Sequence, residues 1–147
     1  PRLLSHIVSL MRTTPGSFPF GYILLIFEGL GDPVLQQTSV ENRLTLLDDL
    51  RPSDAFPIGR HLSVFFVCTP TRAVEGDVGA EAGGLERPPA RCVADVSGTA
   101  HVGYGLGTAA GAGYATPGVY VVRPDMVVGF RAKGQVPLGF LKGYLNA

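Results

Sequence analysis

Tyr22-Ile23-Leu24-Leu25-Ile26-Phe27 is a stretch in which every residue is apolar or aromatic, and it stands between Gly21 and Gly29. A strand that is apolar at every position is typical of a sheet that is covered on both faces. Leu62 to Cys68 is a second such stretch, apolar except at Ser63, and it ends at Thr69-Pro70. Two such strands favour an α/β protein in which helices pack on both sides of a central sheet.

Helical patterns precede, separate and follow these strands. An apolar stripe over residues 3–11 predicts a first helix, which ends at the Thr-Thr-Pro-Gly stretch of residues 13–16. Thr38-Ser39-Val40-Glu41 is a capping-box pattern, because its hydroxyl and carboxylate can satisfy exposed backbone N–H groups at a helix start. The face of that helix is given by Val40, Leu44, Leu47 and Leu50. A closing helix is expected over residues 136–145, with Pro137 in its first turn.

The second half of the chain predicts three shorter strands. Residues 90–96 suit an edge strand, and residues 99–106 suit a short helix. Residues 119–122 and 126–130 read as two strands that Arg123-Pro124-Asp125 joins in a tight antiparallel hairpin. This order of elements is that of a thioredoxin-like fold, with a mixed sheet, a terminal hairpin and a C-terminal helix. Pro117 precedes the hairpin at the position where such folds carry a cis-proline.

Composition limits the class of protein. The chain has 147 residues, 12 Lys+Arg and 12 Asp+Glu, which suits one domain over residues 1–147 with no net charge. A neutral chain has no electrostatic footprint for nucleic acid or an anionic membrane, and it resists self-association poorly. The longest apolar run is far shorter than the roughly 20 residues of a membrane-spanning helix, and no secretory signal is visible. Residues 74–91 are rich in Gly and Pro and predict a flexible insertion.

Cysteine usage argues against thioredoxin-type chemistry. Cys68 and Cys92 form no CxxC pair, and their spacing matches no common zinc or redox motif. The interpretation favoured by the sequence is two thiols that pack as small hydrophobic groups in a reducing compartment, the cytoplasm. No cluster of Cys, His and Asp predicts a metal site.

Two stretches carry a resemblance to a known family. The hairpin Val119-Tyr-Val-Val-Arg-Pro-Asp-Met-Val-Val-Gly-Phe-Arg131 and the segment Asp95-Val-Ser-Gly98-Thr-Ala-His-Val-Gly-Tyr104-Gly105 resemble the C-terminal domain of phenol hydroxylase-type, FAD-dependent aromatic monooxygenases. That domain is thioredoxin-like, lacks redox cysteines and is associated with dimer contacts. The resemblance covers nearly the whole chain in order, with the insertion at residues 74–89 as its main departure.

The resemblance implies a structural function. The domain would serve as a homodimerisation or docking module of a flavoprotein hydroxylase, with FAD on a preceding portion of the full-length protein and no cofactor within this chain. The residues that match the family motif would have structural roles: Arg123, Pro124, Asp125, Asp95 and Gly98.

An alternative hypothesis is a stand-alone tailoring enzyme that uses acid–base chemistry. His101 and Tyr104 are three residues apart, so on a helix they share a face, and together with Tyr120 they could move a proton. Such an isomerase, cyclase or dehydratase would act on an apolar aromatic or polyketide-like molecule. The plainer interpretation places His101 on the surface and packs Tyr104 on the sheet.

Overall fold

The computed structural model describes the core of the chain: residues 4–7, 9, 21–31, 43, 45–51, 62–69, 90–95, 98–107, 115–134 and 138–145. The named elements follow each other in a strand-rich order. They are β1 (Tyr22–Phe27), β2 (Leu62–Cys68), β3 (Ala90–Ala94), α4 (Thr99–Gly103), β4 (Gly118–Val122), β5 (Val128–Lys133) and α5 (Leu138–Leu145). Residues 4–9 and 43–49 add helical segments, of which residues 8 and 44 are not described.

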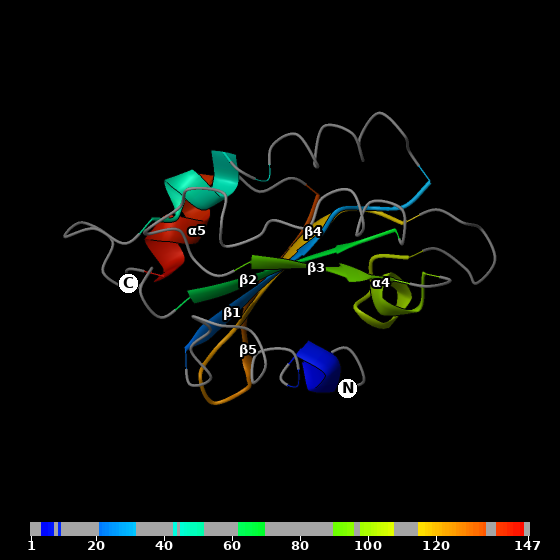
Figure 1. The fold of residues 1–147 in the computed structure, drawn as a ribbon, viewed down its shortest axis with the longest axis horizontal. Coiled ribbons are helices and arrows are strands. Elements are labelled where there is room, and N and C mark those ends of the chain that lie inside the picture. Colours follow the sequence, from blue (N-terminus) through cyan, green and yellow to red (C-terminus); the bar gives the residue numbers. More distant parts are fainter. Residues whose placement is uncertain are drawn as a thin grey trace.

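A five-stranded mixed sheet in the order β3-β2-β1-β4-β5 forms the centre of the molecule (Figure 1). β1 lies between a parallel neighbour, β2, and an antiparallel neighbour, β4. β3 continues the parallel half, and β5 continues the antiparallel half. The carboxyl ends of β1, β2 and β3 therefore lie along the same edge of the sheet.

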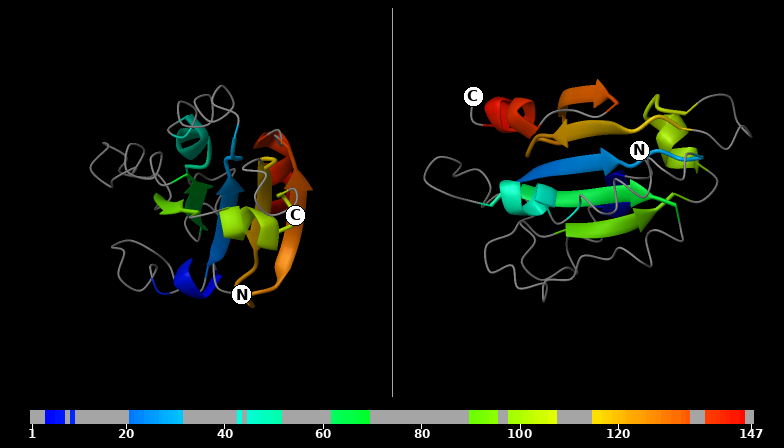
Figure 2. Two further views of the ribbon diagram at one scale, coloured as in Figure 1. Left: turned by 90° about the vertical axis from the view of Figure 1, so that its right-hand side faces the viewer. Right: turned by 90° about the horizontal axis from the view of Figure 1, so that it is seen from above.

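Alternate side chains of the strands enter two separate cores, one on each face of the sheet. The first core includes Phe27 and Phe65 and is covered by Ile7 of the N-terminal helical segment and by α4. The second includes Leu24 and Phe66 and is covered by the helical segment of residues 43–49 and by α5. Figures 1 and 2 show these helices on opposite sides of the sheet. The expected α/β architecture, with helices on both faces, is confirmed.

Most predicted strand bounds agree with the structure to within two residues, because the buried runs are long and uninterrupted. The second strand of the hairpin begins later than expected, at Val128. Met126 takes a positive φ of 69°, and the Arg123 N–H donates to the Val127 carbonyl, so residues 123–127 form the turn. The turn thus absorbs two residues that the apolar pattern alone assigns to the strand.

Several expected features lie outside the described residues. These include the capping box of residues 38–41 and most of the expected insertion, although Ala90 and Arg91 belong to β3. The peptide bond before Pro117 is trans, since no cis bond occurs among the described residues.

Candidate functional site

Polar groups gather where the three parallel strands end. Glu28 follows β1, Cys68 is the last residue of β2 and Asp95 follows β3. Their backbones are joined, because the Glu28 N–H donates to Val67 O at 2.9 Å and the Asp95 N–H donates to Cys68 O at 2.7 Å. The carboxyl ends of parallel strands are the usual place for a site in an α/β sheet. We define this edge, with the side chains that pack on it, as the parallel-strand edge.

A buried ion pair lies on the second-core face of this edge. Glu28 and Arg43 are each only 2% exposed, and the guanidinium donates to both carboxylate oxygens, with 2.7 Å between Arg43 Nε and Glu28 Oε2. The guanidinium also lies over the Phe66 ring, 5.4 Å from its centroid. Burial acts to lower the pKa of Arg43, but the hydrogen bond and charge of Glu28 outweigh it and raise that pKa. The Arg43 guanidinium therefore remains charged inside the protein.

The two thiols lie on the same face as the ion pair. Cys92 is opposite Phe66 in the register, and Cys68 is two residues further along β2, so the side chains are diagonal neighbours. A hydrogen bond with Cys92, then burial and the Glu28 carboxylate, raise the pKa of Cys68 far above its ordinary value. Cys68 Sγ also lies 3.8 Å from Val93 O. Cys68 is buried and stays a thiol, whereas Cys92 is half-buried.

A buried histidine bridge lies on the first-core face. His101 has no exposed surface, and its Nδ1 lies 2.7 Å from Asp95 Oδ2. Its Nε2 accepts a hydrogen bond of 3.1 Å from the Gly29 N–H. This pattern requires the neutral ring with its proton on Nδ1, because Nε2 acts as an acceptor. Burial lowers the pKa of His101, although Asp95 and Glu28 oppose that shift.

Asp95 and Gly98 together start the helix that carries His101. The Asp95 carboxylate accepts hydrogen bonds from the Ala100 and His101 N–H groups, at 2.8 and 2.9 Å. It thereby satisfies two backbone donors at the beginning of α4, as an N-cap side chain does. Gly98 has a φ of 72°, a left-handed conformation that glycine adopts without steric cost.

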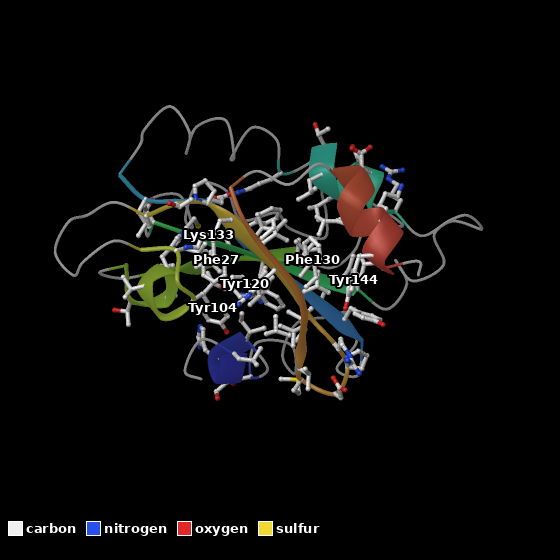
Figure 3. The ribbon with its side chains drawn as sticks, turned by 180° about the vertical axis from the view of Figure 1, so that it is seen from behind. Phe27, Tyr104, Tyr120, Phe130, Lys133 and Tyr144 are labelled. Carbon is white, nitrogen blue, oxygen red and sulfur yellow. The ribbon has the colours of Figure 1, made fainter. Side chains whose placement is uncertain are left out.

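The other two residues of the acid–base hypothesis lie beside His101. Figure 3 shows Tyr104 and Tyr120 gathered against Phe27. The rings of Tyr104 and Tyr120 meet edge to face at 4.9 Å, and the Tyr120 hydroxyl donates to the Tyr104 carbonyl. Burial, and then the neighbouring Tyr120, raise the pKa of Tyr104. The three predicted residues are thus brought together, but as a packed aromatic cluster.

The Arg-Pro-Asp turn lies at the far end of the hairpin, away from this edge. Arg123 and Asp125 form an ion pair of 2.8 Å between side chains that are about half exposed. The Asp125 carboxylate also accepts a hydrogen bond from the Val127 N–H. Pro124 lies between them in the exposed turn. These contacts stabilise a turn and do not form a site.

Two classes of site find no support in the part of the chain that the structure describes. No group of three His, Cys, Asp or Glu side chains is arranged to hold a metal ion there. None of the described helices is long and apolar enough to cross a membrane.

Comparison with known proteins gives the fold. No protein-family model and no curated protein matches the chain. Among solved structures, Mycobacterium tuberculosis AhpC is 16% identical with a TM-score of 0.56, and the match covers 88% of this chain and 73% of that chain. The reduced 2-Cys peroxiredoxin of Plasmodium vivax is 12% identical with a TM-score of 0.60, covering 86% and 76%. The thiol peroxidase of Chromobacterium violaceum is 15% identical with a TM-score of 0.54, covering 86% and 71%. The protein thus has a thioredoxin-like fold without a CxxC pair.

The identification with phenol hydroxylase-type monooxygenases is wrong. The similar structures are peroxiredoxins and a thiol peroxidase, and no family model supports the hydroxylase domain. The structural function expected from that resemblance, flavoprotein dimerisation or docking, is corrected with it. The Arg-Pro-Asp motif misled because the turn contacts of Arg123 and Asp125 explain it locally, so any hairpin can use it.

The acid–base interpretation also fails on geometry. Both ring nitrogens of His101 are engaged, with Asp95 and with Gly29, so no lone pair faces a substrate. The plainer expectation, an exposed His101, is wrong as well, since the side chain is fully buried. The Phe27 ring packs edge to face against His101, with 5.0 Å between the ring centroids, and the sequence gives no sign of this contact.

Sequence reasoning missed Glu28, Gly29 and Arg43 as parts of the site. A signal for Glu28 exists, because it directly follows a buried strand, as Asp95 does. Arg43 is four residues before Leu47, so it falls on the buried face of a helix, where a charge demands a partner. The identity of that partner comes from the tertiary structure.

Proposed function

We propose that the protein is a thiol-based redox protein in which Cys92 and Cys68 form a dithiol–disulfide couple that reduces a hydroperoxide. The observation that carries the proposal is the placement of the two cysteines on paired neighbouring strands, where Cys92 lies opposite Phe66 and Cys68 follows two residues further along β2 on the same face of the sheet. The similarity to structures named as peroxiredoxins and a thiol peroxidase supports the same chemistry. A reducing compartment such as the cytoplasm, where free thiols persist, suits this function.

The two cysteines take different parts in this chemistry. Cys92 is half-buried on β3 and is the thiol that a small peroxide reaches first. Its thiolate attacks one peroxide oxygen, the O–O bond breaks, and an alcohol or water leaves, so Cys92 becomes a sulfenic acid. Cys68 then attacks the Cys92 sulfur, the S–S bond forms, and water leaves with the Cys68 proton. An external dithiol reduces the disulfide and completes the cycle.

The surroundings of the thiols fit this division. The raised pKa of Cys68 keeps it protonated, which suits a resolving thiol that reacts only after Cys92 is oxidised. The Arg43 cation lies close enough for both thiols to act on its pKa, and it lowers that of Cys68. A disulfide between diagonal neighbours requires their Cα atoms to approach within about 7 Å. β3 is one of the two outer strands of the described sheet and pairs directly with β2, which places the two cysteines on adjacent strands.

The test is oxidation with hydrogen peroxide, followed by mass spectrometry of alkylated peptides. The wild-type protein is expected to lose both free thiols together and to give a Cys68–Cys92 cross-linked peptide. Cys68→Ser is expected to stop at a sulfenic acid on Cys92, which dimedone traps, and Cys92→Ser is expected to lose the fast reaction. Oxidation of Cys68 before Cys92, or survival of both thiols at peroxide levels that oxidise a thiol peroxidase, would overturn the proposal.

A homodimer belongs to the same proposal. Met126, Val127 and Val128 are 43, 52 and 42% exposed, so the hairpin presents three neighbouring apolar side chains. Zero net charge leaves no long-range repulsion between two copies. Val127→Asp is expected to shift the protein from dimer to monomer in sedimentation experiments, whereas an unchanged sedimentation coefficient would exclude the hairpin as the contact.

A further inference from the structure

His101 is held more tightly than a packing residue requires. The Asp95 carboxylate binds its ring and also its backbone N–H, and the Phe27 ring meets it edge to face at 5.0 Å. The remaining ring nitrogen accepts the N–H of Gly29, 72 residues earlier in the chain. The ring therefore joins the end of β1 to the start of α4 across the parallel-strand edge.

A short path leads from this bridge to the thiols. Glu28 directly precedes Gly29, and its N–H donates to Val67 O, next to Cys68. The Glu28 carboxylate binds Arg43, and the charges of both residues act on the pKa of Cys68. The segment after Gly29 is held against residue 115, because the backbones of Leu30 and Ala115 exchange two hydrogen bonds of 3.0 Å. Movement of Gly29 must move Glu28.

We propose that His101 is a positioning residue for the dithiol site, which through the Gly29 N–H holds Glu28 and Arg43 in place beside Cys68 and Cys92. The inference rests on the proposed redox function, although its structural part can be tested alone. Protonation of Nε2 places two N–H donors against each other, so the bridge to Gly29 breaks when His101 becomes charged. Glu28 and Arg43 are therefore held in place at neutral pH, and this restraint is lost in acid.

The titratable groups that face His101 determine where this release occurs. Asp95, after β3, binds the ring nitrogen Nδ1, and Glu28, after β1, acts on the ring through its charge. Tyr104 and Tyr120 pack on the same Phe27 ring as His101. The two carboxylates favour the charged ring, but burial outweighs them and lowers the pKa of His101 below its ordinary value of 6.5. Because burial lowers the pKa of His101, the bridge to Gly29 breaks at a lower pH than an exposed histidine would require.

The experiment compares the wild-type protein with His101→Gln between pH 7.5 and pH 4.5. The Gln side chain can accept the Gly29 N–H but does not titrate. His6→Gln serves as the matched control, because His6 is exposed in the N-terminal helical segment. Two quantities are measured: the protection factor of the Gly29 amide by NMR, and the rate at which iodoacetamide alkylates Cys92. The alkylation rate is divided by the rate for His101→Gln at the same pH. The change of the Cys92 thiolate fraction with pH then cancels.

In the wild type and in His6→Gln, the Gly29 protection factor is expected to fall by up to about tenfold per pH unit below pH 6.5. The alkylation ratio is expected to rise by at least about threefold over the same range, because a released segment uncovers the thiols. His101→Gln is expected to keep its protection. Constant Gly29 protection while the His101 ring titrates, or an alkylation ratio that does not change with pH, overturns the inference.

A second variant, Asp95→Asn, allows the inference to be tested even if His101→Gln does not fold. Asp95→Asn removes a carboxylate that favours the charged ring, so the loss of Gly29 protection is expected to shift to lower pH; a shift to higher pH overturns the inference. If peroxide forms no Cys68–Cys92 disulfide while Gly29 protection and alkylation behave as stated, the redox function fails and the positioning role stands.

Discussion

The parallel-strand edge holds a buried ion pair, whereas the turn of the β4–β5 hairpin holds an exposed one. At the edge, Glu28 and Arg43 are 2% exposed and fully paired, whereas Arg123 and Asp125 at the hairpin are about half exposed. A buried pair is costly to break because one uncompensated charge remains inside, whereas an exposed pair contributes little. The stability of the folded chain therefore depends on specific polar contacts mainly at one end of the sheet, the parallel-strand edge.

The largest effect is expected from breaking the buried pair. Arg43→Met leaves the Glu28 carboxylate buried without its cation, and the free energy of unfolding is expected to fall by about 3–5 kcal/mol. Arg123→Met is the matched change in the exposed pair and is expected to cost less than about 1 kcal/mol. Urea unfolding of both variants measures the difference, and equal losses would show that the two pairs are equivalent.

Two glycines provide a second comparison of the same regions. Gly29 and Gly134 have φ values of 84° and 83°, so alanine is strained at both positions, by about 1–2 kcal/mol. A Cβ at Gly29 would also lie 3.1 Å from Ala115 O, whereas nothing lies within 4 Å at Gly134. Gly29→Ala is therefore expected to lower the thermal midpoint more than Gly134→Ala. The opposite order would mean that the segment after β1 yields more easily than the end of β5.

His101 at the parallel-strand edge is expected to make the free energy of unfolding depend on pH. Because burial lowers the pKa of His101 in the folded protein, the unfolded chain binds more protons below about pH 6.5. The free energy of unfolding should therefore decrease as the pH falls from 6.5 to the folded-state pKa, and this contribution is fully present above pH 6.5. Urea midpoints of wild type and His101→Gln measure it. Parallel pH profiles of the two proteins would contradict it.

The smallest effect is expected from the substitution of Ser63 in β2. Ser63 Oγ is buried without a hydrogen-bond partner in the part of the chain that the structure describes. Ser63→Ala removes this unsatisfied group and is expected to leave stability unchanged or to raise it by about 1 kcal/mol. Leu62→Ala, at the neighbouring position, is expected to lower it by about 2–5 kcal/mol. A clear loss of stability in Ser63→Ala would reveal a partner for the hydroxyl.

The elements of the fold were open to prediction, and the function was not. Residues 22–27 are apolar or aromatic throughout and residues 62–68 are so except at Ser63, a pattern that a sheet covered on both faces buries. The turn at Arg123-Pro124-Asp125 could also be predicted from the sequence. It led to the wrong family because such turn contacts are common to many hairpins. The site could not be predicted fully, since Gly29 and His101 carry no pattern that links them.

The order of the amino acids is enough to specify which segments are strands, that both faces of the sheet are covered, and that the two cysteines form no CxxC pair. These properties follow from local periodicity and spacing, which any stretch of chain carries alone. Three contacts depend on the folding of distant segments onto each other: Cys68 lies diagonally across from Cys92, Glu28 pairs with Arg43, and His101 is buried between Asp95 and Gly29. The parallel register of β1, β2 and β3 is the reason, because it brings distant strand ends to a single edge.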